Sequence, residues 1–328
     1  MAVRTAAFFH PAATAKVAEL PEVAELTPAG RENLANLGID EIRADDGLTA
    51  FDLAAEAGRR ALAGAGLDAA ELGALIVVEP RAPAALLASE ATRLQAEFGA
   101  HRALTFSVGG LGCVSVTPAL LAARGLLAAD PELGEVLVVH GSKPATPARY
   151  RHPVTVNGDG GGAVVLARHG PVSVLDILQE SNGRHWDLFR VDYRDRPVRD
   201  WREECRDLPD YSFGLAVETR NRLRELRRRL FDRNGLRPDE VACYLSHNLS
   251  AAAFRFAEEV LEAELSPVCR EHLRTLGHLG ANDVLLNLWA EIGRGGLGDG
   301  KYAVLLNASP AAAWSLVLLG TGAGDDLL

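Results

Sequence analysis

Short, continuously apolar runs alternate along the chain with longer amphipathic stretches. Strand-like runs lie at 74–78, 103–108, 135–139, 162–166, 241–245, 302–306 and 314–319, and a further one opens the chain and ends at His10-Pro11. Runs that are apolar at every position suit strands that are buried on both faces of a sheet. Because these runs are separated by helix-like patterns, the sequence predicts an α/β protein.

The segments between the predicted strands favour helices. They cover 49–65, 86–98, 119–128, 211–231, 250–265 and 282–292. The first begins with a start signal, because Thr49 and Asp52 have the spacing of a capping box. The stretch 181–209, which is rich in Arg, Asp and Trp, has no clear period. We expect it to be an irregular excursion near the joint between two similar halves.

One cysteine stands where a predicted strand ends and a small-residue helix pattern begins. Cys113 follows a cluster of glycines that includes Gly112, and the helix pattern follows it directly. Unpaired N–H groups and the positive dipole end at a helix start favour thiolate over thiol. The glycines allow a thioester to approach closely. Cys113 is therefore predicted to be a nucleophile, whereas Cys243, inside an apolar run, has the context of a core residue.

Composition and charge exclude several classes of protein. The 328 residues are 48% apolar and 24% charged, which is ordinary for a soluble globular protein of one large or two smaller domains. A net charge of −10 argues against non-specific nucleic-acid binding. We find no apolar run of the roughly 18 to 20 residues that a membrane span needs. The four cysteines lack metal-ligand spacing, so we expect a reducing cytoplasm, no disulfide framework, no metal and no cofactor.

Two further segments have the composition and position expected of parts of an active site around Cys113. The glycine-rich stretch 157–163 precedes a predicted strand, and His247 ends another strand, from which its side chain can reach a neighbouring cleft. Taken in order, these segments resemble the ketoacyl-ACP synthase III family of the thiolase superfamily over about 37–319. The resemblance is carried by Gly38-Ile39, the strand 75–78, Cys113 with its helix, 158–163, His247, Gly277 and Trp314.

This resemblance implies a fold and a division of the chain. The family has a thiolase-like five-layer αβαβα sandwich of two duplicated halves, and its members are usually homodimers. The N-terminal half, 1–169, would carry the nucleophilic Cys113. The C-terminal half, 170–328, would carry the catalytic His247.

The catalytic set departs from the family at one position. The family uses Cys, His and Asn, and Cys113 and His247 match the first two. By spacing, His278 occupies the position of the Asn, and Asn282 and Asp283 follow it. Decarboxylative condensation needs two neutral donors for an enolate oxygen, which the family's His and Asn supply. His278 could donate one hydrogen bond if its tautomer is suitable.

Asp283 opens a second interpretation of the same segment. A carboxylate bound to an imidazole fixes the tautomer of the ring and stabilises its protonated form. Cys113, His247 and Asp283 would then form an acyl-transfer triad, with His247 as general base. Some family members from natural-product pathways have such a Cys–His–Asp set and transfer acyl groups without condensing them, and 277–283 resembles that subgroup. Whether Asp283 or His278 is the partner of His247 is left open.

The oxyanion-binding loop departs from the family as well. In the family one donor is the N–H of the cysteine, and the other comes from a loop before a Trp. Counting back from Trp314 puts Pro310, which has no N–H, at the donor position, and a shift of one residue brings in Ser309 or Ala311. The predicted substrate-binding residues are Gly112, Asn282, Ser309, Pro310 and Ala311.

The acyl donor is predicted from a third departure. Family members that use coenzyme A often clamp its adenine with a Trp and an Arg, and this chain has Glu32 and Asn36 at those spacings. An acyl carrier protein thioester is therefore the expected donor, and a coenzyme A thioester a less favoured one. The arginines of 220–229 could steer an acidic carrier protein, or form an ordinary solvated helix face. The acceptor is expected to be a small molecule or a carrier-bound group, with no nucleic acid or membrane involved.

Three functions fit these residues. The first is an acyltransferase of specialised biosynthesis, of polyketide or non-ribosomal type. It would move an acyl group from a carrier-protein thioester through Cys113 to a hydroxyl, amine or thiol acceptor. The second is a decarboxylative condensing ketoacyl synthase III. The third is a non-catalytic partner subunit of a related synthase, although such subunits usually lose the nucleophile or the histidine and this chain keeps both.

Overall fold

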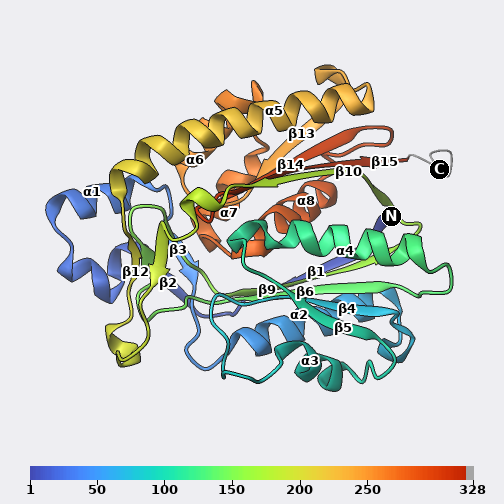
Figure 1. Cartoon of the computed structure of the whole chain (residues 1–328), viewed down its shortest axis with the longest axis horizontal. Helices are drawn as coiled ribbons and strands as arrows, with labels where there is room; N and C mark the ends of the chain where they lie inside the picture. The colour runs from blue at the N-terminus through green and yellow to red at the C-terminus, as the bar shows by residue number, and fades with distance from the viewer. Residues whose placement is uncertain (323–328) are drawn as a thin grey trace.

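A nine-stranded mixed sheet runs through the protein, whose computed structural model describes residues 1–322 (Figure 1). The strand order is β13-β14-β15-β10-β1-β9-β6-β4-β5. The bounds are β1 Ala2–Phe9, β4 Ala74–Val78, β5 Leu104–Val108, β6 Val136–Ser142, β9 Gly160–Ala167, β10 Val172–Ser181, β13 Val241–Ser246, β14 Tyr302–Ser309 and β15 Ala313–Thr321. The pairs β13–β14, β4–β5 and β4–β6 are parallel, and the other neighbours are antiparallel.

The nine strands form two layers that meet along a short seam. β1 and β10 pair only through Ala2–Ser173 and Val3–Val172, after which β1 continues along β9 and β10 along β15. In Figure 1, β10, β13, β14 and β15 lie above the remaining five strands. Strands up to β9 thus occupy one layer, and strands from β10 onward occupy the other. The duplication of the chain into 1–169 and 170–328 stays a prediction.

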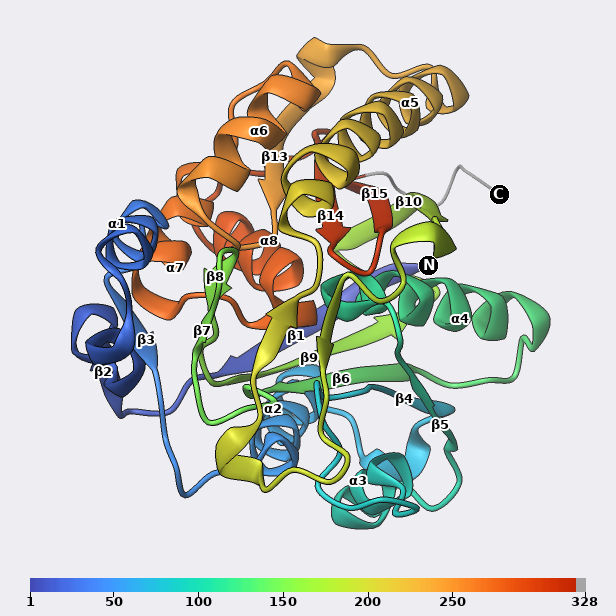
Figure 2. The same ribbon diagram turned by 60° about the vertical axis from the view of Figure 1, so that its left-hand side comes forward.

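Helices fill the space between the two strand layers and cover their outer faces. The bounds are α1 Pro28–Asn36, α2 Ala50–Ala65, α3 Glu90–Phe98, α4 Val116–Ala129, α5 Ala216–Asn234, α6 Ala251–Leu261, α7 Pro267–Leu276 and α8 Asp283–Gly293. Figures 1 and 2 show α4 and α8 between the strand layers, α2 and α3 below them, and α5 and α6 above. This is the expected five-layer αβαβα sandwich, so the predicted fold class is confirmed.

Short strand pairs complete the fold outside the main sheet. They are β2 Thr14–Lys16 with β3 Glu41–Arg43, β7 Tyr150–Arg151 with β8 Thr155–Val156, and β11 Phe189–Val191 with β12 Glu203–Cys205. The last pair lies within 181–209, which the sequence predicts to be irregular. That stretch is therefore mostly irregular, as expected, but it folds back on itself as a small hairpin.

The predicted helix 49–65 is confirmed together with its start signal. The Asp52 N–H donates to Oγ1 of Thr49 over 3.2 Å, and the Asp52 carboxylate accepts from the Thr49 N–H over 2.8 Å. Both bonds satisfy polar groups that the first turn of a helix would otherwise leave unpaired.

Three other predicted helices have different ends. The helix predicted at 86–98 begins only at Glu90, because Ser89 caps it by accepting from the N–H of Thr92. The helix predicted at 250–265 ends at Leu261, where Glu262 takes a left-handed conformation, and α7 follows as a separate helix. The helix predicted at 211–231 begins with a π-helical turn over Asp210–Leu215 and continues as α5 to Asn234.

The most apolar helical segment is the one that begins at the predicted nucleophile. Gly112–Ala129 is long and apolar enough to cross a membrane by length and composition, which corrects the expectation that no stretch of the chain reaches that length. Half of this segment is buried within the protein, and α4 lies between the two strand layers (Figure 1). This burial is typical of the core helix of a soluble protein.

Candidate active site

Cys113 lies at the junction between the lower strand layer and the central helix. A turn after β5 leads into a short 3₁₀ segment, Gly112–Ser115, and α4 follows at once. Gly112 has φ +57, and a Cβ at this position would come within 2.6 Å of Oγ of Ser309, so a larger residue does not fit. The Cys113 carbonyl accepts a hydrogen bond of 2.7 Å from Asn307. The nucleophile is therefore fixed by contacts with the other strand layer.

Burial and one hydrogen bond favour the protonated thiol of Cys113, in contrast to the thiolate that the helix start predicts. Sγ lies 3.1 Å from the carbonyl oxygen of Ala308, so the sulfur must be the donor of that contact. Burial raises the pKa of Cys113 to about 12, and the charge of Asp283 raises it further, while Arg151 and Arg81 oppose the rise. Burial thus outweighs the helix start. Cys113 needs a neighbouring base before it can attack.

His278 has a carboxylate partner. Its Nδ1 lies 2.6 Å from Oδ2 of Asp283, the first residue of α8. The oxygens of Asp283 also accept from the N–H groups of Leu279, over 2.8 Å, and of Asn248, over 2.9 Å. Because a carboxylate accepts, Nδ1 of His278 carries the proton and Nε2 is free to act as a base. Burial lowers the pKa of His278 despite the carboxylate, so the ring is neutral near pH 7.

A glycine holds His278 in place. Gly277 ends α7 with φ +66, and a Cβ there would lie 2.7 Å from both Cγ2 of Ile42 and the carbonyl oxygen of Val156. The backbone of His278 bonds to the segment that carries the glycine-rich motif: its N–H donates to Val156 over 2.9 Å and its carbonyl accepts from Gly158 over 3.2 Å. The predicted motif at 157–163 therefore positions His278.

His247 lies at the end of β13, as predicted, and its ring is bonded on one side only. Nδ1 lies 3.4 Å from Oγ of Ser246 and the backbone of Leu306 also bonds to the ring, whereas Nε2 is buried and has no hydrogen-bond partner among residues 1–322. Burial and the neighbouring His278 lower the pKa of His247 to about 4. The two rings are 6.5 Å apart between centroids. Asp283 bonds to the backbone N–H after His247, so the direct His247–Asp283 pair of the predicted triad gives way to a His278–Asp283 pair.

Two cavities meet at the site. The first, here called the Cys113 cavity, has a volume of about 350 Å³ and is lined by Cys113 and His278. The second, the His247 cavity, has a volume of about 480 Å³. It is lined by His247 and by Asn36, which stands where family members often have a residue that clamps coenzyme A. Ser309 and Pro310 line both cavities. The cysteine and the two histidines thus lie around the end of β14.

The loop predicted to bind an oxyanion is a tight turn between β14 and β15. The N–H of Ala311 is bonded to Oγ of Ser309 over 3.1 Å, and the N–H of Ala312 to the carbonyl of Ser309 over 2.9 Å. Pro310 has no N–H to offer. The hydroxyl proton of Ser309 remains available, and this oxygen lies close to Gly112.

Asn282 has a structural position instead of the predicted substrate contact. Its amide donates to the carbonyls of His140, over 3.4 Å, and Gly160, over 3.3 Å, and the residue is buried. These bonds tie the turn before α8 to β6 and β9. The Asn282 side chain therefore satisfies backbone groups inside the core. This position corrects the expectation that Asn282 faces substrate.

The sequence analysis missed several charged and polar residues of the Cys113 cavity. They are Glu79, Arg81, His140, Arg151, Arg190 and Glu203. Glu79 and Arg81 follow the carboxyl end of β4, and His140 lies near the end of β6, which is the edge where sites of parallel sheets form. The rule that sites form at this edge of a sheet could have identified these last three residues. Among the residues that the structure describes, no group of His, Cys, Asp or Glu could hold a metal ion.

Comparison with known proteins gives a consistent result. No protein-family model matches the chain. A curated beta-ketoacyl-[acyl-carrier-protein] synthase III of Roseiflexus castenholzii is 27% identical over 287 residues, which cover 83% of each chain. Among solved structures, ChlB3, described as an acyltransferase, superposes with a TM-score of 0.84 at 23% identity, covering 98% of this chain and 97% of that one. AbyA1, a tetronic acid condensing enzyme, superposes with a TM-score of 0.77 at 22% identity, covering 97% and 99%.

The sequence match and the shared fold agree with the cysteine–histidine site. The chain is an enzyme similar to the ketoacyl-ACP synthases III over most of its length, and it shares their fold. It therefore belongs with enzymes that either condense or transfer acyl groups.

Proposed function

We propose that this protein is an acyltransferase of specialised biosynthesis, which moves an acyl group from a carrier-protein thioester through Cys113 to a hydroxyl, amine or thiol acceptor. The observation that carries the proposal is the 2.6 Å contact between His278 and Asp283. A histidine–carboxylate pair suits proton transfer during acyl transfer. ChlB3, a structural neighbour described as an acyltransferase, agrees with this function.

Acylation would begin with the thiol of Cys113. Nε2 of His278 accepts the thiol proton, and Asp283 stabilises the imidazolium that forms. The sulfur attacks the thioester carbonyl, the carbon–sulfur bond of the donor breaks, and His278 returns the proton to the leaving thiol. In the second half-reaction the same nitrogen accepts a proton from the acceptor, which attacks the acyl-enzyme. The carbon–sulfur bond to Cys113 breaks, and His278 returns the proton to the sulfur of Cys113.

The oxyanion would be bound by one backbone and one side-chain donor. The N–H of Cys113 is directed toward its own sulfur, where it lowers the pKa of the thiol. Oγ of Ser309 accepts from Ala311, so its own proton can point into the cavity. We infer that this hydroxyl replaces the backbone donor that Pro310 cannot supply.

A decarboxylative condensing enzyme is the second candidate, favoured by the curated relative named beta-ketoacyl-[acyl-carrier-protein] synthase III. The tautomer of His278 argues against it. Nδ1 of His278 donates to Asp283, so Nε2 of this neutral ring is an acceptor. An enolate oxygen needs donors, and His278 stands where the family has a donor Asn.

The partners follow from surface features. We propose an acyl carrier protein as donor, with a coenzyme A thioester as the lesser alternative. The predicted basic face of α5 supports docking only weakly, because Arg222, Arg228 and Arg229 form ion pairs with neighbouring carboxylates. Arg224 of the same helix forms no ion pair within the described part of the chain. The free cysteines agree with a cytoplasmic location.

A homodimer is also proposed. β5 is an edge strand of the sheet and exposes Leu104 at 51%, and the loop before α3 exposes Leu86 and Leu87 at 76% and 107%. Edge strands and clustered apolar side chains are surfaces that proteins normally cover. A second copy that pairs along β5 would cover both.

Intact-protein mass spectrometry with acyl-carrier donors tests the proposed function. The wild-type protein should gain one acyl group, Cys113→Ala should gain none, and His278→Ala should gain it far more slowly. A labelled malonyl donor separates the two candidates, because only condensation releases CO2 together with a ketoacyl product. Acylation of Cys113→Ala at the site, or coupled CO2 release, would overturn the acyltransferase proposal.

A further inference from the structure

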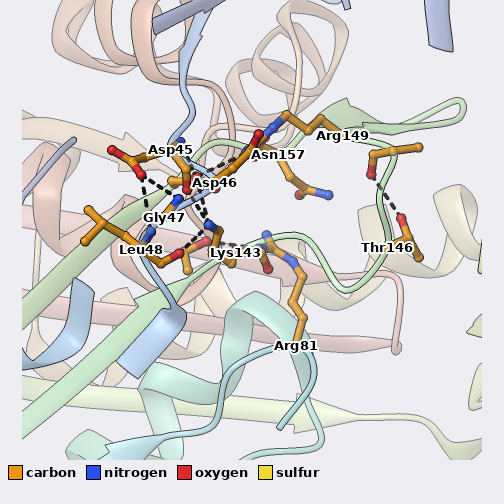
Figure 3. Close-up of polar contacts among 12 residues, drawn as sticks. Asp45, Asp46, Gly47, Leu48, Arg81, Lys143, Thr146, Arg149 and Asn157 are labelled. Atoms are coloured by element: carbon orange, nitrogen blue, oxygen red, sulfur yellow. Dashed lines mark hydrogen bonds and ion pairs between the residues drawn. The ribbon is translucent and has the colours of Figure 1, made fainter. Parts of the chain in front are cut away.

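Arg81 presents an unused donor to the cavity of the nucleophile. Arg81 follows β4 in the chain. Its Nη1 donates to Oγ of Ser142 over 2.9 Å and to the carbonyl of Lys143 over 3.2 Å (Figure 3). Nη2 is buried and has no hydrogen-bond partner anywhere in the described chain. A buried guanidinium group with a free N–H₂ is costly unless something accepts from it.

The free nitrogen of Arg81 lies beside open space. Arg81 lines the Cys113 cavity together with Cys113, His278 and Gly280. Gly280 has φ +63, and a Cβ at this position would lie 3.4 Å from Nη2 of Arg81 and 3.2 Å from Nε2 of His140. The absence of a side chain at Gly280 therefore leaves room for an atom of a ligand in front of Arg81.

The other cations near this cavity have acidic partners. Arg151 forms an ion pair with Glu203, although its Nε is buried without a hydrogen-bond partner, and its guanidinium lies 4.7 Å from the centre of the Phe189 ring. Arg190 is paired with Asp192 over 2.8 Å and is exposed.

Two further charged groups, Lys143 and Glu79, lie near Arg81. The amine of Lys143 donates to backbone carbonyls of 45 and 48, as Figure 3 shows. Glu79 also lines the cavity, with its carboxylate against the backbone of Gly109. Nη2 of Arg81 is thus a cationic donor that these neighbours leave unused.

We propose that the acyl group loaded on Cys113 ends in a carboxylate, which accepts hydrogen bonds from Nη2 of Arg81. The substrate class is a short dicarboxylic acyl thioester. This inference rests on the proposed function, because it requires an acyl group on Cys113. The sulfur of Cys113 takes the acyl group from the donor thioester, and the donor leaves as a free thiol. The distal carboxylate takes no part in these bond changes. Its role is to bind the guanidinium, which selects the substrate.

Two donors of the same shape test the charge directly. Succinyl and succinamoyl thioesters of N-acetylcysteamine differ only in whether the distal group is a carboxylate or an amide. Acylation of Cys113, measured by intact mass over time, should be about 10- to 100-fold faster with the succinyl donor at low concentration, the range for a hydrogen bond to a charged group. Arg81→Met should lose this preference, and Arg81→Lys should recover part of it. Arg59→Met, which removes an ion-paired arginine of α2 outside the cavity, should keep it.

The outcomes separate this inference from the function on which it rests. If the wild-type protein is acylated on Cys113 equally well by both donors, or better by the amide, the inference fails and the acyltransferase stands. An equal loss with both donors in Arg81→Met would mean that Arg81 only holds its loop, which also overturns the inference. If neither these donors nor neutral acyl donors load Cys113, the proposed function itself fails. The wild-type comparison needs no variant, so a poorly folded Arg81→Met protein leaves the test intact.

Discussion

Nδ1 of His278 lies 2.6 Å from Oδ2 of Asp283, so the carboxylate of this site belongs to His278 and not to His247. The same carboxylate accepts the N–H of Asn248, the residue that follows His247. The buried side chain of Asp283 thus fixes the tautomer of His278 and also the backbone beside His247. This arrangement gives the site a base whose orientation does not depend on substrate.

Asp283→Asn should lower the rate of Cys113 acylation by about 10³-fold or more, because an amide can hold His278 in the wrong tautomer. The measurement is kcat/KM with a carrier-protein donor, read together with the melting temperature. Asp176→Asn is a matched control, since Asp176 is also a buried carboxylate and bonds to Asn234 away from the site. The control should lose stability but keep its rate. A rate for Asp283→Asn within a few-fold of the wild-type rate would show that the His278–Asp283 pair does not support the chemistry.

The resting thiol should be unreactive near neutral pH. The pKa of Cys113 is raised to about 12 by burial, so the fraction of thiolate should become large only as pH rises far above 9. We expect the rate of iodoacetamide alkylation of Cys113, followed by mass spectrometry, to be very low from pH 6 to 8 and to rise by about tenfold per pH unit without a plateau up to pH 10. Cys205, which is only partly buried, is an internal comparison in the same protein. An alkylation midpoint below pH 7 would mean that the helix start prevails over burial.

The fold could be predicted from sequence because its signals are local. A capping box at Thr49 and Asp52 fixes where α2 begins, and continuous apolar runs such as Ala74–Val78 identify buried strands. β10 was missed, because Asp176 and Ser173 interrupt its apolar pattern. Asp176 is tolerated inside this strand because Asn234 and Arg233 of α5 bind it, which is a tertiary contact.

The site was predictable in its residues but not in their pairing. Motif spacing identified Cys113, His247, His278 and Asp283, yet spacing alone cannot say which ring a carboxylate reaches. The thiol's protonation state depends on burial by both strand layers, which a helix-start argument does not contain. Arg81 carried no motif, since its importance comes from contacts with Ser142, at the end of β6, and Lys143, which are 61 and 62 positions away in the chain.

Acid should destabilise this protein through its buried histidines. Burial lowers the pKa of His140 to about 4, whereas an unfolded histidine titrates near 6.5. Because the unfolded chain binds the proton more readily, the stabilising contribution is present above pH 6.5 and is lost as pH falls toward 4. For His140 the loss between pH 7 and pH 5 is about 2 kcal/mol.

His140→Asn removes the titrating ring of His140 but keeps a donor for the carbonyl of Val78, which Nδ1 of His140 contacts over 3.0 Å. The free energy of unfolding, measured with urea at pH 7 and pH 5, should therefore fall less with acid in this variant than in the wild type. His101→Asn is a suitable control, since His101 is exposed. Equal acid sensitivity of His140→Asn and the wild type would contradict the assignment.

Ser309→Ala should slow acylation by about 10²-fold, the effect of removing one oxyanion donor. The hydroxyl lies against Gly112 and next to Pro310, which cannot donate. The effect should fall on kcat more than on KM, because the oxyanion develops only in the transition state. Ser315→Ala removes a buried hydroxyl of β15 that bonds to Thr117 and should affect stability only. A Ser309→Ala rate within two-fold of the wild type would leave the second donor to another group.

The exposed edge of the lower strand layer should be the dimer surface. β5 ends the sheet and exposes Leu104 at 51%, and a strand edge with apolar side chains is stable in water only when it is covered. Sedimentation should give a mass near twice 34.9 kDa for the wild type. Leu104→Asp should shift the protein toward the monomer, because a desolvated carboxylate opposes pairing along β5. Leu208→Asp is the matched control: Leu208 is also exposed, at 44%, but it lies outside the main sheet. A wild-type monomer, or dissociation by both variants alike, would exclude β5 as the interface.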